Sequence, residues 1–313
     1  MKAMKIIAIV ATAVFCIAMA VGITLTAVGM EDGINTLEEL FWQSEGQLSH
    51  QGPDQTASAD GLKKIKLDVG AAELIVQRSD RSDIGLSYTS NRPVEGKSPV
   101  SLSESGGTLT VKTLDQTIHL WNFFRDFRLV RVVIDLPRDY SGELDAEVGA
   151  GTLTLRDQHT FSSMKVDVGA GECLMGSVKT DKADLSVSAG HIEAEKLDAV
   201  QVKLSVGIGA AELAGLTGGA SIDVSTGGAE LTFDRLGGDI SCDVSMGSVT
   251  LELPSDTAAE VSLSASMGNA DQDFGSRFAG EDRDGTLEGR LNGGGPYRIS
   301  GSASMGNIQL EER

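Results

Sequence analysis

A short motif that returns about every 20 residues constrains the fold of this 313-residue chain more than any other feature. Its clearest copy, Val166–Glu172, alternates apolar and polar residues and then turns through Gly, Ala and Gly. Counting the residue that follows the valine or its equivalent places the copies at Gly149, Gly169, Ser188, Gly209, Ser225, Ser245, Ser266 and Ser304. Most steps match this period closely, but the step to Ser225 is shorter and the step to Ser304 spans almost two periods.

This spacing predicts an all-β fold built from stacked coils. A period of about 20 residues is too short for two helices and a turn, but it accommodates two or three short strands joined by corners. One coil alone could not bury enough apolar surface to offset the conformational entropy lost on ordering. Stacking gives each strand partners above and below and joins the small cores into a column. We therefore expect a single-stranded, parallel β-helix, or β-solenoid.

Small residues in the motif indicate where each coil changes direction. Glycine takes positive φ at no steric cost, and small residues let neighbouring coils approach at strand spacing. The predicted structural corners are Gly70, Gly149, Gly151, Gly169, Gly171, Gly190, Gly209, Gly227, Gly247, Gly268 and Gly306. Residues 271–295 are rich in Asp, Gly and Arg, and we interpret them as one irregular coil or a loop insertion.

The amino-terminal end has the pattern of a membrane anchor. No charged residue occurs in the 23 residues from Ile6 to Val28, a length that suffices to span a bilayer. Lys2 and Lys5 precede this stretch, which predicts a single-pass protein of the cell membrane with a cytoplasmic amino terminus and an extracytoplasmic remainder. The alternative is a signal peptide cleaved after Ala18–Ala20, although the apolar run continues past that site.

The chain divides into three regions on this interpretation. Residues 1–30 form the transmembrane signal anchor, and residues 31–61 form a juxtamembrane helix and a linker rich in Ser, Gln, Gly and Asp. Residues 62–313 form the solenoid domain, with regular coils from residue 144 onward.

One segment, residues 118–127, departs from the repeats. It holds large aromatic side chains in a chain that is only 4% aromatic. The plainer interpretation is a loop or short helix that covers an open end of the core, and the other is an exposed patch that contacts a ligand or partner. The candidate partner-binding residues are Trp121, Phe123, Phe124 and Phe127.

The net charge of the chain limits the classes of partner that it can bind. A net charge of −19 repels nucleic acid, which excludes nucleic-acid binding, and leaves a cationic ligand, a polysaccharide or another envelope protein as candidates. Alternation points two acidic columns outward: Asp68, Asp167, Asp223 and Asp243, and beside the corner Glu73, Glu172, Glu212 and Glu230. Such columns could collect Ca²⁺, but a solvated acidic face is the favoured interpretation, and we expect no cofactor.

Residues that could carry catalysis are sparse. Cys173 and Cys242 alternate with polar neighbours, so both should face inward as buried thiols too far apart for a disulfide. The histidines have no metal-ligand spacing to one another or to a cysteine; they are His50, His119, His159 and His191. No catalytic or metal-ligating residue is therefore nominated.

The repeated Val-Gly-Ala-Gly and Val-Ser-Met-Gly corners, the strand Arg131–Pro137 ahead of them and the single amino-terminal anchor resemble one bacterial family. This is the "putative adhesin" domain of unknown function, common in Gram-positive bacteria, and the resemblance covers residues 62–310. It implies a right-handed, single-stranded β-helix at the cell envelope, in a family associated with adhesion or envelope stress. It carries over no catalytic residues, and the aromatic segment is not part of its pattern.

These observations predict a non-catalytic β-solenoid of the cell envelope that acts as an adhesion, scaffold or envelope-stress-related binding module. The alternative is a carbohydrate-active β-helix enzyme, a lyase or hydrolase, which would need paired carboxylates or Ca²⁺ with a basic residue in a groove. Carboxylates are plentiful in the repeats, whereas lysines and arginines are few and scattered. Binding is therefore the favoured interpretation.

Overall fold

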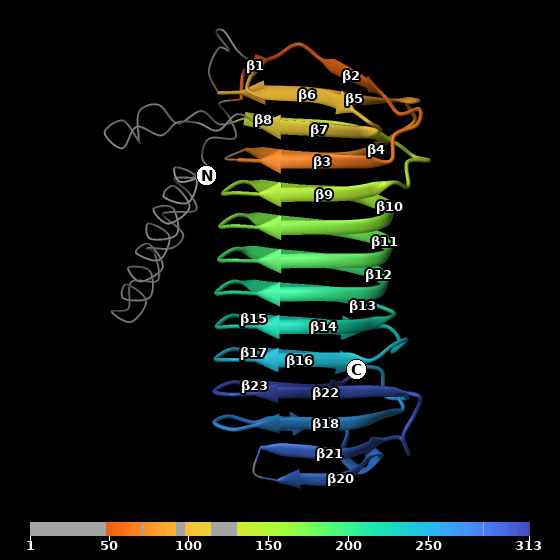
Figure 1. Cartoon of the computed structure of the whole chain (residues 1–313), viewed down its shortest axis with the longest axis vertical. Helices are drawn as coiled ribbons and strands as arrows, with labels where there is room; N and C mark the ends of the chain where they lie inside the picture. The colour runs from red at the N-terminus through yellow and green to blue at the C-terminus, as the bar shows by residue number, and fades with distance from the viewer. Residues whose placement is uncertain (1–47, 71, 92–97, 114–129, 284) are drawn as a thin grey trace, which may run out of the picture.

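A computed structural model describes residues 48–70, 72–91, 98–113, 130–283 and 285–313, which form one column of stacked strands (Figure 1). At its N-terminal end lie β1 (His50–Gln51), β2 (Gln55–Ser58), β3 (Lys64–Val69), β4 (Glu73–Ser79), β5 (Asp83–Ser90), β6 (Val100–Ser105), β7 (Thr108–Thr113) and β8 (Val130–Pro137). The middle holds β9 (Glu143–Val148), β10 (Thr152–Val168), β11 (Glu172–Val187), β12 (His191–Val206), β13 (Ala210–Leu216), β14 (Gly219–Val224), β15 (Gly228–Phe233), β16 (Ile240–Val244) and β17 (Ser248–Leu253).

The C-terminal end holds β18 (Ala259–Ala265), β19 (Ala270–Gln272), the short 3-10 helix η2 (Gly275–Arg277), β20 (Phe278–Arg283), β21 (Thr286–Leu291), β22 (Tyr297–Ala303) and β23 (Asn307–Glu312). The described part of the chain is therefore all-β apart from η2, as the repeat spacing predicted. No helix in this part is long and apolar enough to cross a membrane. The expected anchor, Ile6–Val28, lies outside the described residues.

The middle coils stack in sequence order through parallel pairing. β10 pairs with β11 and β11 with β12 along almost their whole length. The register of the first pair shifts by one residue between Leu155 and Gln158, whereas that of the second pair stays constant. Residues that occupy one position in successive coils are Thr152, Glu172, His191, Ala210, Gly228 and Ser248. Successive members of this series are about 20 residues apart, which confirms the expected coil length.

The register corrects one position in the repeat count. Gly207, and not Gly209, follows the valine of its coil, because Gly207 N donates to Val187 O at 2.7 Å. Ser188 N makes the equivalent bond to Val168 O at 2.8 Å. Gly209 therefore lies two positions further along the corner. The uneven step to Ser225 came from this misplacement.

The core of the column follows from simple alternation. The strands nearest the viewer in Figure 1, among them β9, β14, β16, β22 and β18, form what we call the front side of the column. Successive coils of this side bury alternate side chains fully; examples are Val166, Leu185, Leu204, Ile222 and Cys242. Their sequence neighbours point outward and are mostly polar. Each inward side chain packs on its counterparts above and below, so every coil adds apolar burial worth about 25 cal/mol per Å². Cys173 and Cys242 are both buried and free, as expected.

At the N-terminal end the coils do not follow sequence order. β3 lies between β7 and β9, and β4 lies between β8 and β10. The first coil of the chain is thus enclosed by later ones, and the outer positions are taken by β5 and β6, which pair antiparallel with β8 and β7. β1 and β2 pair with β5, so the segment expected to be a linker contributes two strands. Its polar residues fit an edge position, where one strand flank meets solvent.

The C-terminal end has the same arrangement. β22 lies between β16 and β18, and β23 lies between β17 and β19, so the last coil of the chain is inserted inside the column (Figure 1). Beyond β18, the hairpin of β21 and β20 adds two antiparallel strands. Residues 271–295, expected to be an irregular coil or loop insertion, therefore contain this terminal hairpin. The long step to Ser304 exists because the chain completes the end before it returns.

Candidate functional site

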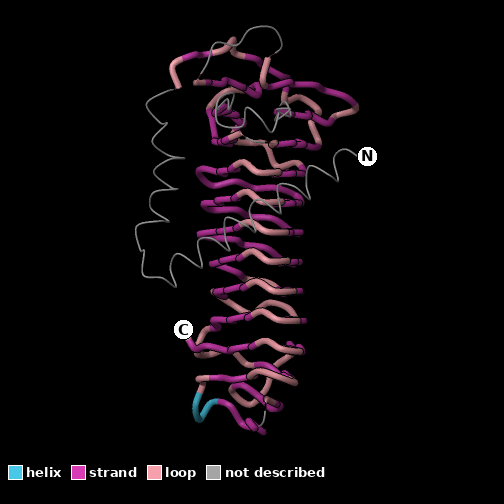
Figure 2. The backbone as a smooth tube through the Cα atoms, turned by 90° about the vertical axis from the view of Figure 1, so that its left-hand side faces the viewer, coloured by secondary structure: helices cyan, strands magenta, loops and turns pink. Residues whose placement is uncertain are grey.

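The corners of successive coils lie above one another and form one edge of the column (Figure 2). A Cβ built on the third corner residue would lie only 2.0–2.3 Å from the carbonyl oxygen of the preceding coil. In spatial order these glycines are Gly151, Gly171, Gly190, Gly209, Gly227, Gly247, Gly306 and Gly268. We call them the glycine column.

Of the two reasons expected for small corner residues, close approach of neighbouring coils is confirmed and positive φ is not. Among corner glycines with described conformations, only Gly268 has a positive φ, of 156°. Close approach of backbones, and not a left-handed conformation, therefore excludes a side chain from the glycine column. Gly149 and Gly169 belong to the first corner position, where a Cβ would lie 3.3 and 2.8 Å from the nearest carbonyl oxygen. Gly70 also lies at this position, since Gly149 N donates to the neighbouring Val69 O.

The four aromatic residues proposed for partner binding, Trp121, Phe123, Phe124 and Phe127, lie outside the described residues. The large exposed apolar side chains of the described surface are Val200, Ile208, Met246, Met267 and Met305.

The structure bears out the first of the two expected acidic columns in part and contradicts the second. Asp68, Asp167, Asp223 and Asp243 do share one column, but Glu147, Ser186 and Ser205 lie among them. The prediction of the second acidic column is wrong. Glu73 and Glu172 align with Thr152, whereas Glu212 and Glu230 align with each other two positions later in the coil. In the described ranges no three His, Cys, Asp or Glu side chains are placed to hold a metal ion.

The front side divides into two differently charged halves. In its N-terminal half, lysine and aspartate alternate from coil to coil at Lys66, Asp145, Lys165, Asp184 and Lys203. In its C-terminal half, the same column continues as Ser221, Ser241, Ser300 and Ser262. The adjacent column there is Asp223, Asp243, Ser302 and Ser264. We call these last eight residues the Ser/Asp face.

The Ser/Asp face is a flat array of small polar side chains. All of its residues are exposed except Ser300, which is half-buried. Ser302 Oγ donates to Asp243 Oδ1 at 3.0 Å, so hydroxyl and carboxylate groups on neighbouring coils already interact. Because parallel strands repeat at about 4.8 Å, the array presents hydrogen-bonding groups at that interval along the column.

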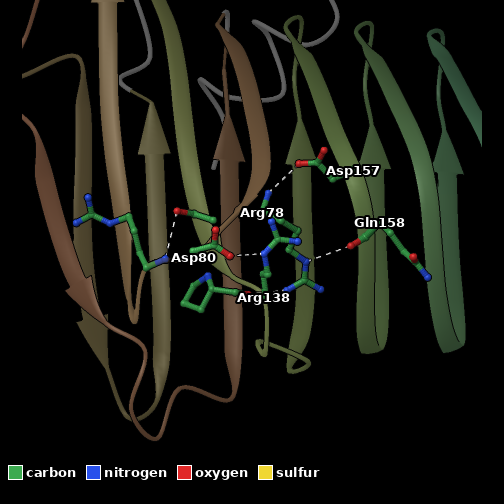
Figure 3. A network of polar contacts seen from close by, with 8 residues as sticks. Arg78, Asp80, Arg138, Asp157 and Gln158 are labelled. Atoms are coloured by element: carbon green, nitrogen blue, oxygen red, sulfur yellow. Dashed lines mark hydrogen bonds and ion pairs between the residues drawn. The ribbon is translucent and has the colours of Figure 1, made fainter.

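A polar network ties the enclosed first coil to both of its neighbours (Figure 3). Arg78 at the end of β4 donates from Nη1 to Pro137 O at 2.7 Å, at the end of β8, and to Tyr140 O at 3.0 Å, just after it. Its Nε donates to Gln158 O at 3.2 Å, and its backbone N–H donates to Asp157 Oδ2 at 3.1 Å. Asp157 has a φ of 67° at the bulge of β10. Burial lowers the pKa of Arg78, and the carbonyl oxygens that accept from its guanidinium offset part of the cost of burying the charge.

His159 lies in the same region and is fully buried. Its ring stacks on Phe161 with centroids 5.6 Å apart, and Nε2 lies 2.5 Å from Arg156 O. Burial lowers the pKa of His159, and the nearby Arg78 charge lowers it further. The imidazole is therefore neutral at pH 7 and serves packing.

A shallow open concavity of about 520 Å³ lies between β18, β20, β21 and β22. Glu260, Glu288, Arg290 and Arg298 line it. Arg290 Nε lies 3.0 Å from Glu260 Oε1, so one carboxylate is already ion-paired.

The two described cysteines lie elsewhere, in the core. Burial raises the pKa of Cys173 and Cys242 to about 12, which keeps both thiols protonated and unreactive.

Sequence reasoning did not identify the Ser/Asp face or the Arg78 network. The serines could have been found from the alternation within each repeat, but their alignment requires the inserted position of β22. No sequence pattern identifies Arg78 as the centre of a network, because its partners are backbone carbonyls of segments distant in the sequence.

The chain matches the Toastrack DUF4097 family over residues 62–311. It is similar in structure to a "putative adhesin" from Bacteroides fragilis (12% identity, 84% of this chain and 98% of that chain covered, TM-score 0.46). A "putative adhesin" from Parabacteroides merdae has 12% identity, coverages of 84% and 96%, and a TM-score of 0.49. A "Putative lipid binding protein" from Parabacteroides distasonis has 15% identity, coverages of 84% and 97%, and a TM-score of 0.46.

Among curated proteins, none matches this sequence. The family match extends over most of the chain and includes the enclosed first and last coils of the column. The repeat motif and the resemblance drawn from it lead to the same family. The chain therefore belongs to the Toastrack DUF4097 family.

Proposed function

We propose that this chain is a membrane-anchored, extracytoplasmic binding module of the cell envelope, acting in adhesion or as a scaffold without catalysis. The apolar stretch Ile6–Val28, preceded by Lys2 and Lys5, supports an anchor with the column outside the membrane. The corner motifs and the strand Arg131–Pro137 resemble a family associated with adhesion, which supports a binding role.

The Ser/Asp face is the observation that carries this proposal. An array of hydroxyl and carboxylate groups repeating at about 4.8 Å suits an extended, hydroxyl-rich polymer such as an envelope polysaccharide, which offers many similar contacts in a row. Each contact is weak alone, and several together provide avidity. The rigid column keeps these groups in register, which limits the entropy lost on binding.

The test is co-sedimentation of the full-length protein in detergent with purified envelope polysaccharide. Ser241→Lys with Ser300→Lys places two long side chains across the middle of the Ser/Asp face and should reduce binding at least tenfold. Thr250→Lys with Gln309→Lys is the matched control, because these residues align in the same way on the back of the same two coils. Unchanged binding by the first pair, or equal loss in both pairs, would refute the role of this face.

Anchoring needs its own test. Protease added to intact protoplasts should degrade the column while the membrane stays sealed. Full protection until detergent is added would place the column inside the cell and contradict the proposed topology.

The alternative function is a carbohydrate-active enzyme. The concavity at the C-terminal end is one specific site at which this alternative can be tested. Glu260 and Glu288 are two carboxylates in one depression, as acid–base hydrolysis of a polysaccharide requires. The ion pair between Glu260 and Arg290 favours a structural role for one of them. Release of reducing ends from envelope polysaccharide by the wild type, lost in Glu288→Gln, would favour the enzyme over the binding module.

A further inference from the structure

Five large apolar side chains are exposed in the part of the chain that the structure describes, and four of them lie at one position of the fold. Ile208, Met246, Met305 and Met267 each occupy the tip of a corner, and Val200 is the one elsewhere. The backbone bonds give the order of the tips: Met246 N donates to Ser225 O, Met305 N to Ser245 O, and Met267 N to Ser304 O. The three methionines therefore lie on three adjacent coils.

This row does not exist in the sequence, where roughly one repeat separates Met246 from Met267 and roughly two repeats separate Met267 from Met305. It arises because the last coil is inserted between β16–β17 and β18–β19. Met305, the last of the three in the chain, thereby becomes the middle one in space. The exposed fractions are 52% for Met246, 50% for Met305 and 67% for Met267, so all three side chains reach solvent.

The fold does not require methionine at this position. The corresponding tips of other coils are Ala150, Ala170, Ala189 and Thr226. These smaller residues make the same backbone bond to the coil before them, with lengths of 2.7–3.0 Å. An exposed long apolar side chain gains little burial, so packing does not explain why three neighbouring tips carry one.

Thioether chemistry offers an explanation. Methionine sulfur is a soft ligand that selects soft monovalent metal ions over hard ones. Neighbouring coils are separated by about 4.8 Å, close to twice a metal–sulfur bond of roughly 2.3 Å, so one ion fits between two sulfurs on adjacent coils. We propose that Met246, Met305 and Met267 form a binding site for a soft monovalent cation of the Cu(I) or Ag(I) type.

The surroundings favour an ion over a protein partner. Each methionine is preceded by serine and followed by glycine, so the apolar row is one residue wide. A specific protein interface buries roughly 800 Å² on each partner, which such a row cannot supply. The net charge of −19 attracts cations to the surface.

The experiment titrates Ag(I), which needs no reductant, into the full-length protein in detergent without chloride. The protein carries Cys16→Ser, so that this thiol does not compete, and ¹³C-methyl methionine reports each thioether by NMR. Signals assigned to Met246, Met305 and Met267 should shift with added Ag(I). The buried Met164 and Met175 should not respond.

The order of the row makes the variants specific. Met305→Leu removes the sulfur shared by both gaps and should weaken Ag(I) binding more than tenfold. Met246→Leu and Met267→Leu each leave one adjacent pair and should weaken it less, while Met175→Leu is the matched control and should change nothing. Absence of shifts at the three exposed methionines, or equal losses in all three exposed-site variants, would overturn the proposal.

Discussion

The middle of the column and its two ends are built from the same coil but connected differently. In the middle, each coil stacks on the next one in the chain, so Thr152 pairs with Glu172 a single repeat later. At the C-terminal end, Ser248 pairs with Asn307, and all of β18 to β22 intervenes between them in the sequence. The middle is thus held by local contacts, and the ends by contacts of long sequence separation.

This difference shows how a repeat protein can protect its ends. An open stack would expose the unpaired backbone groups of a parallel strand, which invite association with other chains. Here the first and last coils are enclosed, and short antiparallel strands take the outermost positions. β20 carries Glu281, Asp282 and Arg283, charges that oppose further strand addition.

The largest expected effect comes from the glycine column, which middle and end share. Gly209→Ala in the middle and Gly306→Ala in the inserted coil each place a Cβ about 2 Å from a carbonyl oxygen. Both should lower the free energy of unfolding by about 3 kcal/mol, measured by urea denaturation. Gly228→Ala is the control, because its Cβ would meet only Ser248 Oγ at 3.7 Å. A small loss of unfolding free energy for Gly306→Ala, beside the full loss for Gly209→Ala, would show that the inserted coil is not enclosed.

The next effect belongs to the N-terminal end alone. Arg78→Met removes donors to Pro137 O, Tyr140 O and Gln158 O, and should cost about 2 kcal/mol of unfolding free energy. Arg81→Met is the control, because Arg81 forms an exposed ion pair with the nearby Asp83 at 2.9 Å. Equal denaturation midpoints for the two variants would mean that the network does not hold the enclosed coil.

Acid should weaken the same end through His159. Since its pKa is lower in the folded state than the usual 6.5, the unfolded chain binds the proton first. The contribution of His159 to stability should therefore be nearly constant well above pH 6.5 and fall as the pH decreases through 6.5, by at most about 1.4 kcal/mol per pH unit. His159→Gln should reduce that dependence between pH 7.5 and 5.5. An unchanged pH profile in the variant would exclude His159 as its source.

The smallest effects distinguish the two halves of the front side. Asp184 lies between Lys165 and Lys203, whereas Asp223 lies opposite Asp243. Asp184→Asn should therefore destabilise, and Asp223→Asn stabilise, by about 0.5 kcal/mol each at low salt. Both differences in denaturation midpoint should shrink in 1 M salt, which screens exposed charges. Shifts of the same sign would contradict the assigned register.

Much of the fold could be predicted from the sequence because the repeat is local. Alternation around Val166 defines inward and outward residues, and the coil length excludes helices. The order of the end coils could not be predicted in this way. The corners at Met246, Met267 and Met305 have the same sequence, Ser-Met-Gly, and fit any order of stacking.

The candidate sites were less predictable for related reasons. A glycine needed for positive φ and one needed for close approach look identical in sequence, so the corners were located but the two expected reasons could not be told apart. The second acidic column failed because Glu172 and Glu212 occupy different positions within their coils. Columns on a solenoid depend on register, and a displacement of two residues separates side chains that motif counting places together.

Insertion of the last coil is the central claim, and a disulfide tests it most directly. Asp243 and Ser302 are opposite each other on adjacent coils, about 4.8 Å apart and within disulfide reach, whereas Ser264 lies one coil further away. Asp243→Cys with Ser302→Cys should therefore cross-link on mild oxidation of the folded protein, as read by peptide mass spectrometry, and Asp243→Cys with Ser264→Cys should not. Cross-linking of the second pair without the first would mean that the coils stack in sequence order, contrary to this structure.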